Sequence, residues 1–306
     1  MIEDLPLVSI VTPSFNQANF IEDAILSVKN QDYPNIEHIV VDGKSADNTT
    51  EILKKHEKNY NLRWISEPDE GQSDAVNKGF MIAKGKIIGW LNSDDVYFAS
   101  DVISYIVKQF KKNPDVDVIF GDSVVINENG FIERVFRTLN WNYLYLLLGA
   151  SYIPQPATFF RKNVITENSL DKNLHFAMDV EFWLRLGKKH KFLHVNKLLA
   201  ADRVHIKTKR LSSSNIKRYR LESKKIRERH GLNANNYFSL LHYLLTFYIH
   251  VMIRLRGIKS IFELEKNNKL FLSIRLKNKY SLILSQLIPS SEISYIRRVI
   301  RTHTRE

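Results

Sequence analysis

The chain has 306 residues, of which 44% are hydrophobic and 25% charged, so it can bury a catalytic domain of about 200 residues and still carry an appended region. It has no cysteine, which excludes disulfides, thiolate zinc sites and a cysteine nucleophile and fits a reducing compartment. The net charge of +12 is unevenly distributed. Residues 1–202 hold 22 Lys and Arg against 27 Asp and Glu, a net −5, whereas residues 203–306 hold 23 against 6, a net +17. Such a basic tail indicates an anionic partner: nucleic acid, a phosphate-bearing substrate or an anionic membrane surface.

Short β-branched apolar runs alternate with helical patterns through the first 120 residues. The first run follows an acidic start and reads as a strand, not a signal peptide, so we expect a cytoplasmic protein. The alternation, with its short connections, predicts an α/β fold with a mostly parallel sheet covered by helices on both faces. The expected strands are Leu7–Thr12, Glu37–Val41, Leu62–Ser66, Ile87–Leu91 and Val116–Phe120; the expected helices contain Phe20–Val28 (capped by Asn19), begin near Asn48, run from a cap at Ser73 through Ala83, and contain Val102, Ile106 and Phe110.

Acidic side chains follow several of these strands. Asp42 ends one strand and Asp94-Asp95 follows another, and such strand ends meet in one crevice in a parallel sheet. Adjacent carboxylates repel one another and are best tolerated beside a cation, and oxygen ligands suit Mg²⁺ or Mn²⁺ better than zinc. The alternative is that one of the pair caps the helix near Ser100. Asp42 and Asp69 can equally belong to plain turns.

Two further segments carry candidate chemistry. Asp179 lies at the start of a helical pattern and either interacts with the helix dipole or serves as a general base. Arg185, in the same pattern, is expected to pair with an acid or to pack its stem. Residues Arg203–Arg210 read RVHIKTKR; if extended, they direct a histidine and several cations to one side, where they suit a diphosphate, although a solvated basic segment is the alternative.

The amino-acid composition changes after residue 203. Ser212–Arg229 is a basic helical pattern, and residues 231–253 contain no Lys, Arg, Asp or Glu. The apolar stretch Tyr237–Ile253 has 17 residues, fewer than the ~20 that a membrane span needs. A helix packed on the catalytic domain and an interfacial helix with basic flanks are the other readings, and we favour the interfacial one.

Seven segments together resemble the family 2 inverting glycosyltransferases, which have the GT-A fold, in the type that builds bacterial surface polysaccharides. The resemblance covers roughly residues 5–210, and the segments occur in the family's order and spacing. They are Ser9–Asn16 (SIVTPSFN), Ile36–Thr49 (IEHIVVDGKSADNT), Ile65–Gly79 (ISEPDEGQSDAVNKG), Ile88–Tyr97 (IGWLNSDDVY), Gln155–Arg161 (QPATFFR), Met178–Leu186 (MDVEFWLRL) and Arg203–His205 (RVH).

The resemblance implies a catalytic domain over residues 1–210, with a basic, mainly helical region over residues 211–306. It also implies a role for each matching residue. Pro13, Phe15 and Asn16 would line the nucleotide pocket, Asp42 would accept a hydrogen bond from the base, and Asp69, Gly71 and Asn77 would lie along the donor floor. Asn92 and Asp94 would face the ribose or sugar, Asp95 and His205 would contact Mn²⁺ or Mg²⁺, Arg203, Lys207 and Lys209 would face the diphosphate, and Asp179 would be the catalytic base.

Two positions depart from the family pattern. Its D-x-D-D is Asn92-Ser93-Asp94-Asp95 here, which removes one charge, and its Glu-Asp is Met178-Asp179, which leaves one candidate base. The expected function is transfer of a sugar from a nucleotide-diphospho-sugar, by family habit a UDP-sugar, to a glycan or lipid-linked acceptor at the inner face of the cell membrane. The alternative is an inactive transferase-like protein that binds a membrane or nucleic acid through its tail. The presence of all four family acids argues against the inactive alternative; these are Asp42, Asp94, Asp95 and Asp179. The tail has no recognised nucleic-acid-binding motif.

Overall fold

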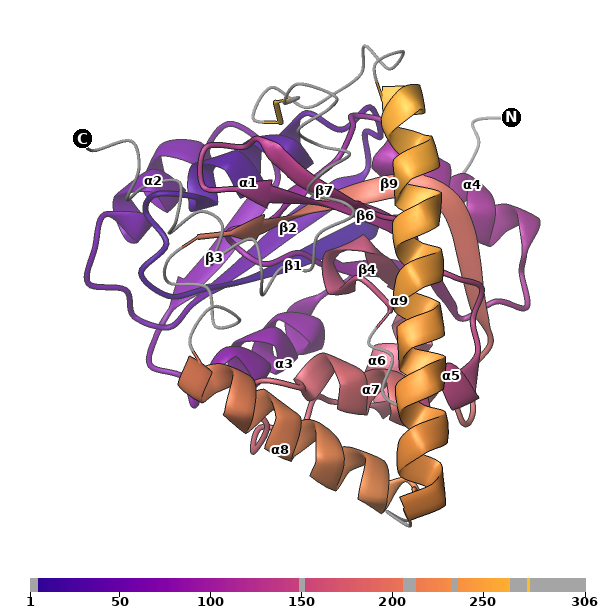
Figure 1. The fold of residues 1–306 in the computed structure, drawn as a ribbon. Coiled ribbons are helices and arrows are strands. Elements are labelled where there is room, and N and C mark those ends of the chain that lie inside the picture. The colour runs from indigo at the N-terminus through magenta and orange to yellow at the C-terminus, as the bar shows by residue number, and fades with distance from the viewer. Residues whose placement is uncertain (1–4, 149–151, 206–212, 233–235, 265–273, 276–306) are drawn as a thin grey trace, which may run out of the picture.

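The computed structural model describes residues 5–148, 152–205, 213–232, 236–264 and 274–275. Within them, the chain forms one nine-stranded mixed sheet with helices on both faces (Figure 1). Along the sheet the strand order is β3-β2-β1-β4-β8-β6-β9-β5, and β7 pairs with β6. The α/β class and the helix-covered sheet are therefore as the sequence predicts.

The first half of the sheet is parallel. Strands β1 (Val8–Ser14), β2 (Ile36–Asp42), β3 (Leu62–Ser66) and β4 (Ile87–Trp90) pair in parallel, and all seven residues of β1 are buried. Burial on both faces explains the largely apolar runs of β1, β2 and β4, whereas the edge strand β3 is only partly buried. The register sets Ser14 beside Asp42 and Asp42 beside Ser66. The carboxyl ends of these strands thus meet at one edge, as expected.

The second half of the sheet contains antiparallel pairs that the sequence does not predict. Strand β8 (Thr158–Arg161) lies antiparallel between β4 and β6 (Val118–Asn127). Strand β6 then pairs in parallel with β9 (Phe192–Val204) and antiparallel with β7 (Ile132–Phe136), while β9 pairs with the short β5 (Val96–Tyr97). Strand β9 therefore delivers its end next to the segment that follows β4.

The helices cover both faces of the sheet. On one face lie α1 (Ile21–Lys29), α2 (Thr49–His56) and α4 (Val102–Lys112) (Figure 1). On the other lie α3 (Gln72–Ile82), α6 (Lys162–Glu167) and α7 (Met178–Leu186), while α5 (Tyr143–Leu147) and the single turn η1 (Gln155–Ala157) lie in connections. The helices predicted over the first 120 residues are all present.

Three predicted caps differ in the structure. Helix α1 has Phe20, not Asn19, at its N-cap, and α3 begins at Gln72 with Gly71 at its N-cap, so Ser73 is already inside the helix. Helix α4 begins at Val102 after Asp101. Neither Asp94 nor Asp95 caps it, which removes the capping explanation for that acidic pair.

Helices α8 (Ser213–Arg229) and α9 (Asn236–Leu264) share the core of the preceding domain. Ile226 of α8 and Ile249 and Ile253 of α9 are buried in the same apolar cluster as α3 and α7. The side chain of Arg137 donates to Ser260 Oγ at 2.6 Å, which ties α9 to the segment after β7. Helix α9 is therefore packed on the body through one face. Among the described residues, no helix is both long and apolar enough to cross a membrane.

Candidate active site

The loop after β1 is hydrogen-bonded to the loop after β2. Asn16 adopts φ 53°, its N–H donates to Ser45 Oγ at 2.8 Å, and its side-chain oxygen accepts from the N–H of Ala46 at 2.9 Å. The left-handed conformation is one that asparagine tolerates better than most residues. Pro13 is buried within β1, whereas Phe15 remains 59% exposed. The predicted pocket residues thus lie in a loop that hydrogen bonds hold in place, with the ring of Phe15 exposed to solvent.

Asp42 is fully buried at the end of β2. Its carboxylate accepts from Ser45 N at 2.9 Å, from Ser66 Oγ at 2.7 Å and from Ser45 Oγ. A Cβ on Gly43 would lie 2.5 Å from Asp69 Oδ2, so only glycine lets the Asp69 side chain come this close to β2. The Asp69 side chain therefore lies against the start of the loop that follows Asp42.

The first turn of α3 joins two parts of the site. Gly71 precedes it with φ 113°, a conformation suited to glycine. Gln72 Nε2 donates to Asn92 Oδ1 at 2.9 Å, while Ser73 Oγ donates to the Leu174 carbonyl at 3.2 Å and contacts the Met178 sulfur at 3.1 Å. The strand end that carries the acidic pair is thereby connected to the start of α7, which carries Asp179.

Asp95 is buried and hydrogen-bonded through both carboxylate oxygens. Its Oδ1 accepts from the backbone N–H of Arg203 at 2.9 Å, and its Oδ2 accepts from Asn92 Nδ2 at 3.1 Å. Asn92 also donates to Gln155 Oε1 at 2.8 Å and accepts from Trp90 Nε1 at 3.0 Å. Asp95 therefore joins the end of β4 to the end of β9.

Asp94 and His205 form a second contact between the same two strand ends. Asp94 Oδ2 lies 3.1 Å from His205 Nε2, and the Asp94 side chain is more accessible, at 21% against 5% for His205. The His205 ring packs on Phe20 with centroids 4.5 Å apart. The carboxylate of Asp94 offers oxygen donors, which suit Mn²⁺ or Mg²⁺. The described residues contain no group of three or more His, Cys, Asp or Glu placed to hold a metal ion.

Arg203 is directed into the protein. Its guanidinium donates to the Asp94 carbonyl at 2.9 Å, the Glu128 carbonyl at 3.1 Å and Asp23 Oδ2 at 2.7 Å, and the residue is only 2% exposed. The sequence predicts a diphosphate contact for this residue, whereas its hydrogen bonds hold the acidic turn in place. Lys207 and Lys209 lie outside the described residues.

Asp179 lies in the first turn of α7 and is half-buried. Its Oδ1 accepts from the N–H of Val180 at 2.9 Å. Glu181 of the same turn pairs with Arg185 at 2.9 Å, and Arg185 also lies over the Phe182 ring. The prediction that Arg185 pairs with an acid is confirmed.

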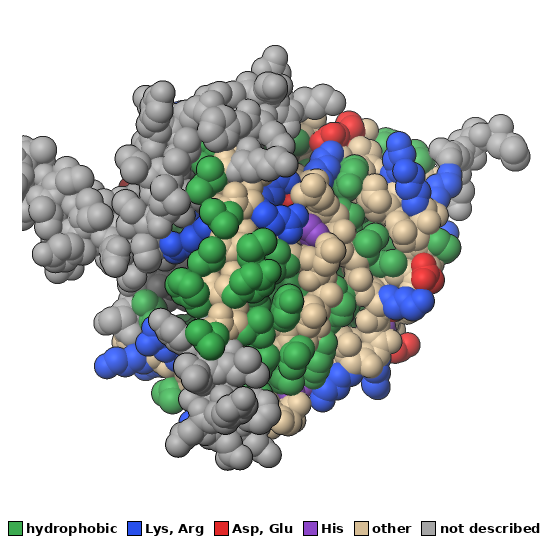
Figure 2. All heavy atoms as spheres, turned by 45° about the vertical axis from the view of Figure 1, so that its right-hand side comes forward, with side chains coloured by type: hydrophobic (Ala, Val, Ile, Leu, Met, Phe, Trp, Pro, Cys, Tyr) green, Lys and Arg blue, Asp and Glu red, His purple; other side chains and the backbone are tan. Residues whose placement is uncertain are grey.

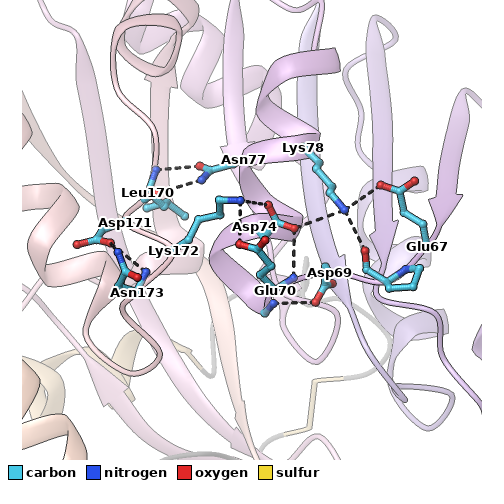
Figure 3. A network of polar contacts seen from close by, with 12 residues as sticks. Glu67, Asp69, Glu70, Asp74, Asn77, Lys78, Leu170, Asp171, Lys172 and Asn173 are labelled. Carbon is cyan, nitrogen blue, oxygen red and sulfur yellow. Dashed lines mark hydrogen bonds and ion pairs between the residues drawn. The ribbon is translucent and has the colours of Figure 1, made fainter.

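The segment before α7 is held against α3 by polar contacts (Figure 3). Asn77 Nδ2 donates to the Leu170 carbonyl at 3.0 Å and its Oδ1 accepts from the Leu170 N–H at 2.8 Å, so both ends of this amide serve the segment and not a donor floor. Lys172 pairs with Asp74 at 3.1 Å. Burial alone would raise the pKa of Asp74, but the hydrogen bond from Lys172 and the charge of Lys78 lower it below its usual range.

Several residues of the site are missed by sequence reasoning. Gln72 and Gln155 both contact Asn92, yet neither titrates nor falls in a recognisable catalytic pattern. Ser45, in the loop after β2, and Ser66, at the end of β3, orient Asp42. Gln155 begins QPATFFR, one of the seven segments that resemble the family. Its position at the start of that segment, directly before a proline, is the signal that could have identified it.

The fold is that of nucleotide-sugar transferases. A mannosyltransferase from Pyrobaculum calidifontis, solved with GDP-Man and Mn²⁺, aligns with a TM-score of 0.59 and 16% identity over 88% of this chain and 77% of that chain. S. aureus TarS 1–349, solved with UDP-GlcNAc, aligns with a TM-score of 0.55 and 20% identity over 65% of this chain and 59% of that chain. At these identities the likeness is one of fold.

Sequence relatives define the class more narrowly. The pattern of Glycosyl transferase family 2 matches residues 9–185, more than half of the chain, so the chain belongs to this family and is a glycosyltransferase. An uncharacterised glycosyltransferase of Mycobacterium tuberculosis is 32% identical over 185 residues, 59% of this chain and 68% of the relative. Chondroitin synthase of Pasteurella multocida is 30% identical over 203 residues, 64% of this chain but only 20% of that enzyme.

The contacts of Asp95 and Asp94 predict different consequences of removing each carboxylate. Asp95→Ala leaves the buried N–H of Arg203 unpaired and should lower the free energy of unfolding by about 1–3 kcal/mol. Asp94→Ala should lower it by no more than about 1 kcal/mol, because that side chain is partly solvated. Urea unfolding of the two variants measures both values. Equal losses would contradict the structural role given to Asp95.

Proposed function

We propose that this enzyme moves a sugar from a nucleotide-diphospho-sugar, a UDP-sugar, to a hydroxyl of a glycan or lipid-linked acceptor in polysaccharide biosynthesis. The observation that carries the proposal is the Asp94–His205 pair, which lies 3.1 Å apart at the ends of β4 and β9, beside the loops that hold Asp42 and Phe15. The relatives support it: TarS was solved with UDP-GlcNAc, and one sequence relative is a chondroitin synthase.

The nucleotide end of the donor fits the β1 and β2 loops. The exposed ring of Phe15 offers a surface on which a base can pack, and Asp42 offers carboxylate oxygens to its N–H groups. Each carboxylate oxygen has two acceptor sites, so the serine donors on Asp42 orient it without exhausting it. Gly71 and Asp69, at the start of α3, would lie along the donor beyond the base.

A divalent cation, Mn²⁺ or Mg²⁺, fits Asp94 and His205 better than Asp95. Both oxygens of Asp95 already accept hydrogen bonds from the protein, whereas Asp94 is more accessible and directly faces the imidazole. We therefore assign the ligand role to Asp94 with His205, and the supporting role to Asp95. When bound, such an ion neutralises charge that develops on a leaving diphosphate.

Asp179 is the proposed general base. The acceptor hydroxyl oxygen bonds to the anomeric carbon as the bond from that carbon to the diphosphate oxygen breaks, and the hydroxyl proton passes to the Asp179 carboxylate. A single displacement of this kind inverts the anomeric carbon. The half-buried first turn of α7 keeps the carboxylate accessible while its neighbour Glu181 is neutralised by Arg185.

Asp179→Asn should lower the rate of transfer by about 10²–10⁴-fold, because the amide cannot accept the proton. Its affinity for UDP should equal that of the wild type. The measurement is sugar release and transfer from UDP-sugars with Mn²⁺, beside a UDP titration, with Glu181→Gln as the matched neighbour. A parallel loss of UDP binding would contradict the role of base, and inactivity of the wild type with every nucleotide-sugar would sink the function itself.

We also propose that α9 rests on an anionic membrane surface, where a lipid-linked acceptor would be found. Ile249, Ile253 and Ile261 face the body, but the helix also exposes large apolar side chains (Figure 2). These are Leu244, Phe247, Tyr248 and Leu255, 52–60% exposed, with Leu144 of α5 53% exposed. Helix α8 exposes the cations Lys217, Arg218, Arg220, Lys224 and Lys225. Apolar anchors with basic neighbours are typical of interfacial helices.

Phe247→Asp with Tyr248→Asp should remove most binding to vesicles of anionic lipid, because charges then replace the anchors. Binding to vesicles should be measured by co-sedimentation at low and high salt, with Met81→Asp as control, since Met81 is an exposed apolar residue of α3, remote in sequence from α9. Unchanged sedimentation of the double variant would contradict the proposal. Stronger binding to DNA than to vesicles would favour nucleic acid as the partner.

A further inference from the structure

Helix α8 supplies a carboxylate to the segment that leads into α7. Glu222 Oε1 accepts from the N–H of His175 at 3.2 Å, and its Oε2 accepts from those of Phe176 and Ala177 at 2.9 and 3.0 Å. These are the three residues directly before α7, whose second residue is Asp179. One side chain, 45 to 47 positions away in sequence, thus fixes three successive backbone groups next to the proposed base.

Helix α7 has no side-chain cap of its own. Its N-cap residue is Ala177, which has no side chain able to accept a hydrogen bond. A carboxylate near the start of a helix is stabilised by the positive end of the helix dipole. Glu222 accepts from the N–H of Ala177 and of the two residues before it, so it fixes the segment that leads into α7 and does not replace an N-cap side chain.

The helix that carries Glu222 is itself fixed to the body. Ile226 is fully buried, Ser223 and Arg227 are buried beside it, and Arg229 pairs with Asp171 at 3.6 Å. On the other side, the segment is held to α3 through Leu170–Asn77 and Lys172–Asp74 (Figure 3). The segment before α7 is thus held by α3 on one side and by α8 on the other. Of these contacts, those of Glu222 are nearest in sequence to Asp179.

We propose that Glu222 is a positioning residue that sets the place of Asp179 for proton abstraction, an inference that rests on the proposed function. Without its carboxylate, the segment 175–177 loses three hydrogen bonds and the first turn of α7 can shift. A displacement of about 1 Å at a reacting group costs as much as 10²-fold in rate. The hydrogen bonds of Glu222 go to residues 175–177 and not to the loops after β1, β2 and β4, so we expect the donor affinity to change little.

The test compares Glu222→Ala and Glu222→Gln with Glu228→Ala, an acid one and a half turns further along α8 whose contact is a 3.8 Å pair with Lys224. Glu222→Ala should lower kcat by about 10- to 100-fold while the UDP affinity changes by less than about twofold. Glu222→Gln, which keeps one acceptor oxygen, should fall between. Glu228→Ala should equal the wild type.

Coupling to Asp179 separates positioning from general damage. In the Glu222→Ala background, Asp179→Asn should cost much less than it does in the wild type, because the base is already misplaced. Additive losses, or an unchanged kcat in Glu222→Ala, would overturn the proposal.

Hydrogen exchange gives a readout that does not depend on activity. The amides of residues 175–177 should exchange faster in Glu222→Ala, with no change in the β1–β4 strands. Unchanged protection would overturn the inference even if no sugar donor were found. Faster exchange without any transferase activity in the wild type would instead mean that the proposed function has failed and the contact stands.

Discussion

The site depends on the buried carboxylate of Asp95. It accepts the backbone N–H of Arg203, 108 residues further along the chain, and the side-chain amide of Asn92. These two bonds fasten the last strand of the sheet to the turn after β4, and Arg203 reinforces the joint by donating to the Asp94 carbonyl. Together with the packing of the His205 ring on Phe20, this joint holds His205 opposite Asp94. A buried carboxylate with both oxygens satisfied is stable in such a position, and one left unsatisfied would be costly.

The other half of the site is built on the same principle, with contacts between distant segments fixing short loops. Asp42 is oriented by serines from its own loop and from β3, and Asp69 packs where Gly43 leaves room for it. The start of α7 lies between α3 and α8. Donor-binding and base-bearing elements thus belong to one connected framework, in which the first turn of α3 touches both Asn92 and Met178.

Much of this fold could be predicted from the sequence because its first half is local. The runs that form β1, β2 and β4 are almost fully buried and therefore largely apolar, and the position of Asp42 and Asp94 at strand ends follows from that. The antiparallel strands escaped prediction because β5 and β8 are too short to show a period, and because their partners lie far away in sequence. Strand β5 pairs with β9, and β8 pairs with β4 and β6.

The roles within the site were harder to predict than their location. Asp94 and Asp95 are adjacent in sequence, and only the fold shows that one faces His205 while the other is enclosed. Arg203 and Asn77 are polar residues in family motifs, yet Asn77 bonds to the backbone of Leu170, and Arg203 bonds to two carbonyls and to the Asp23 carboxylate. Glu222 lies in a helix whose net charge is strongly positive. The composition of that helix therefore predicts an anionic partner and gives no sign that this acid binds the segment before α7.

The packed reading of α9 is borne out by its buried isoleucines, while the interfacial reading remains a proposal. Its isoleucines at 249, 253 and 261 pack on the body, as a packed helix requires, and the aromatic residues at 247 and 248 remain exposed, as an interfacial helix requires. A mean hydropathy sums over both faces and cannot separate them. The structure separates the two faces, because it shows which side chains of α9 are buried against the body and which are exposed.

The most direct test of the account is calorimetric titration of UDP into the protein with Mn²⁺ and with EDTA, for the wild type, Asp94→Ala, His205→Ala and Asp95→Asn. The account predicts metal-dependent binding in the wild type that disappears in the first two variants and survives in Asp95→Asn, which keeps an acceptor for the Arg203 N–H. Binding that is indifferent to EDTA, or lost in Asp95→Asn but kept in Asp94→Ala, would contradict the assignment of Asp94 and His205 as the metal-holding pair.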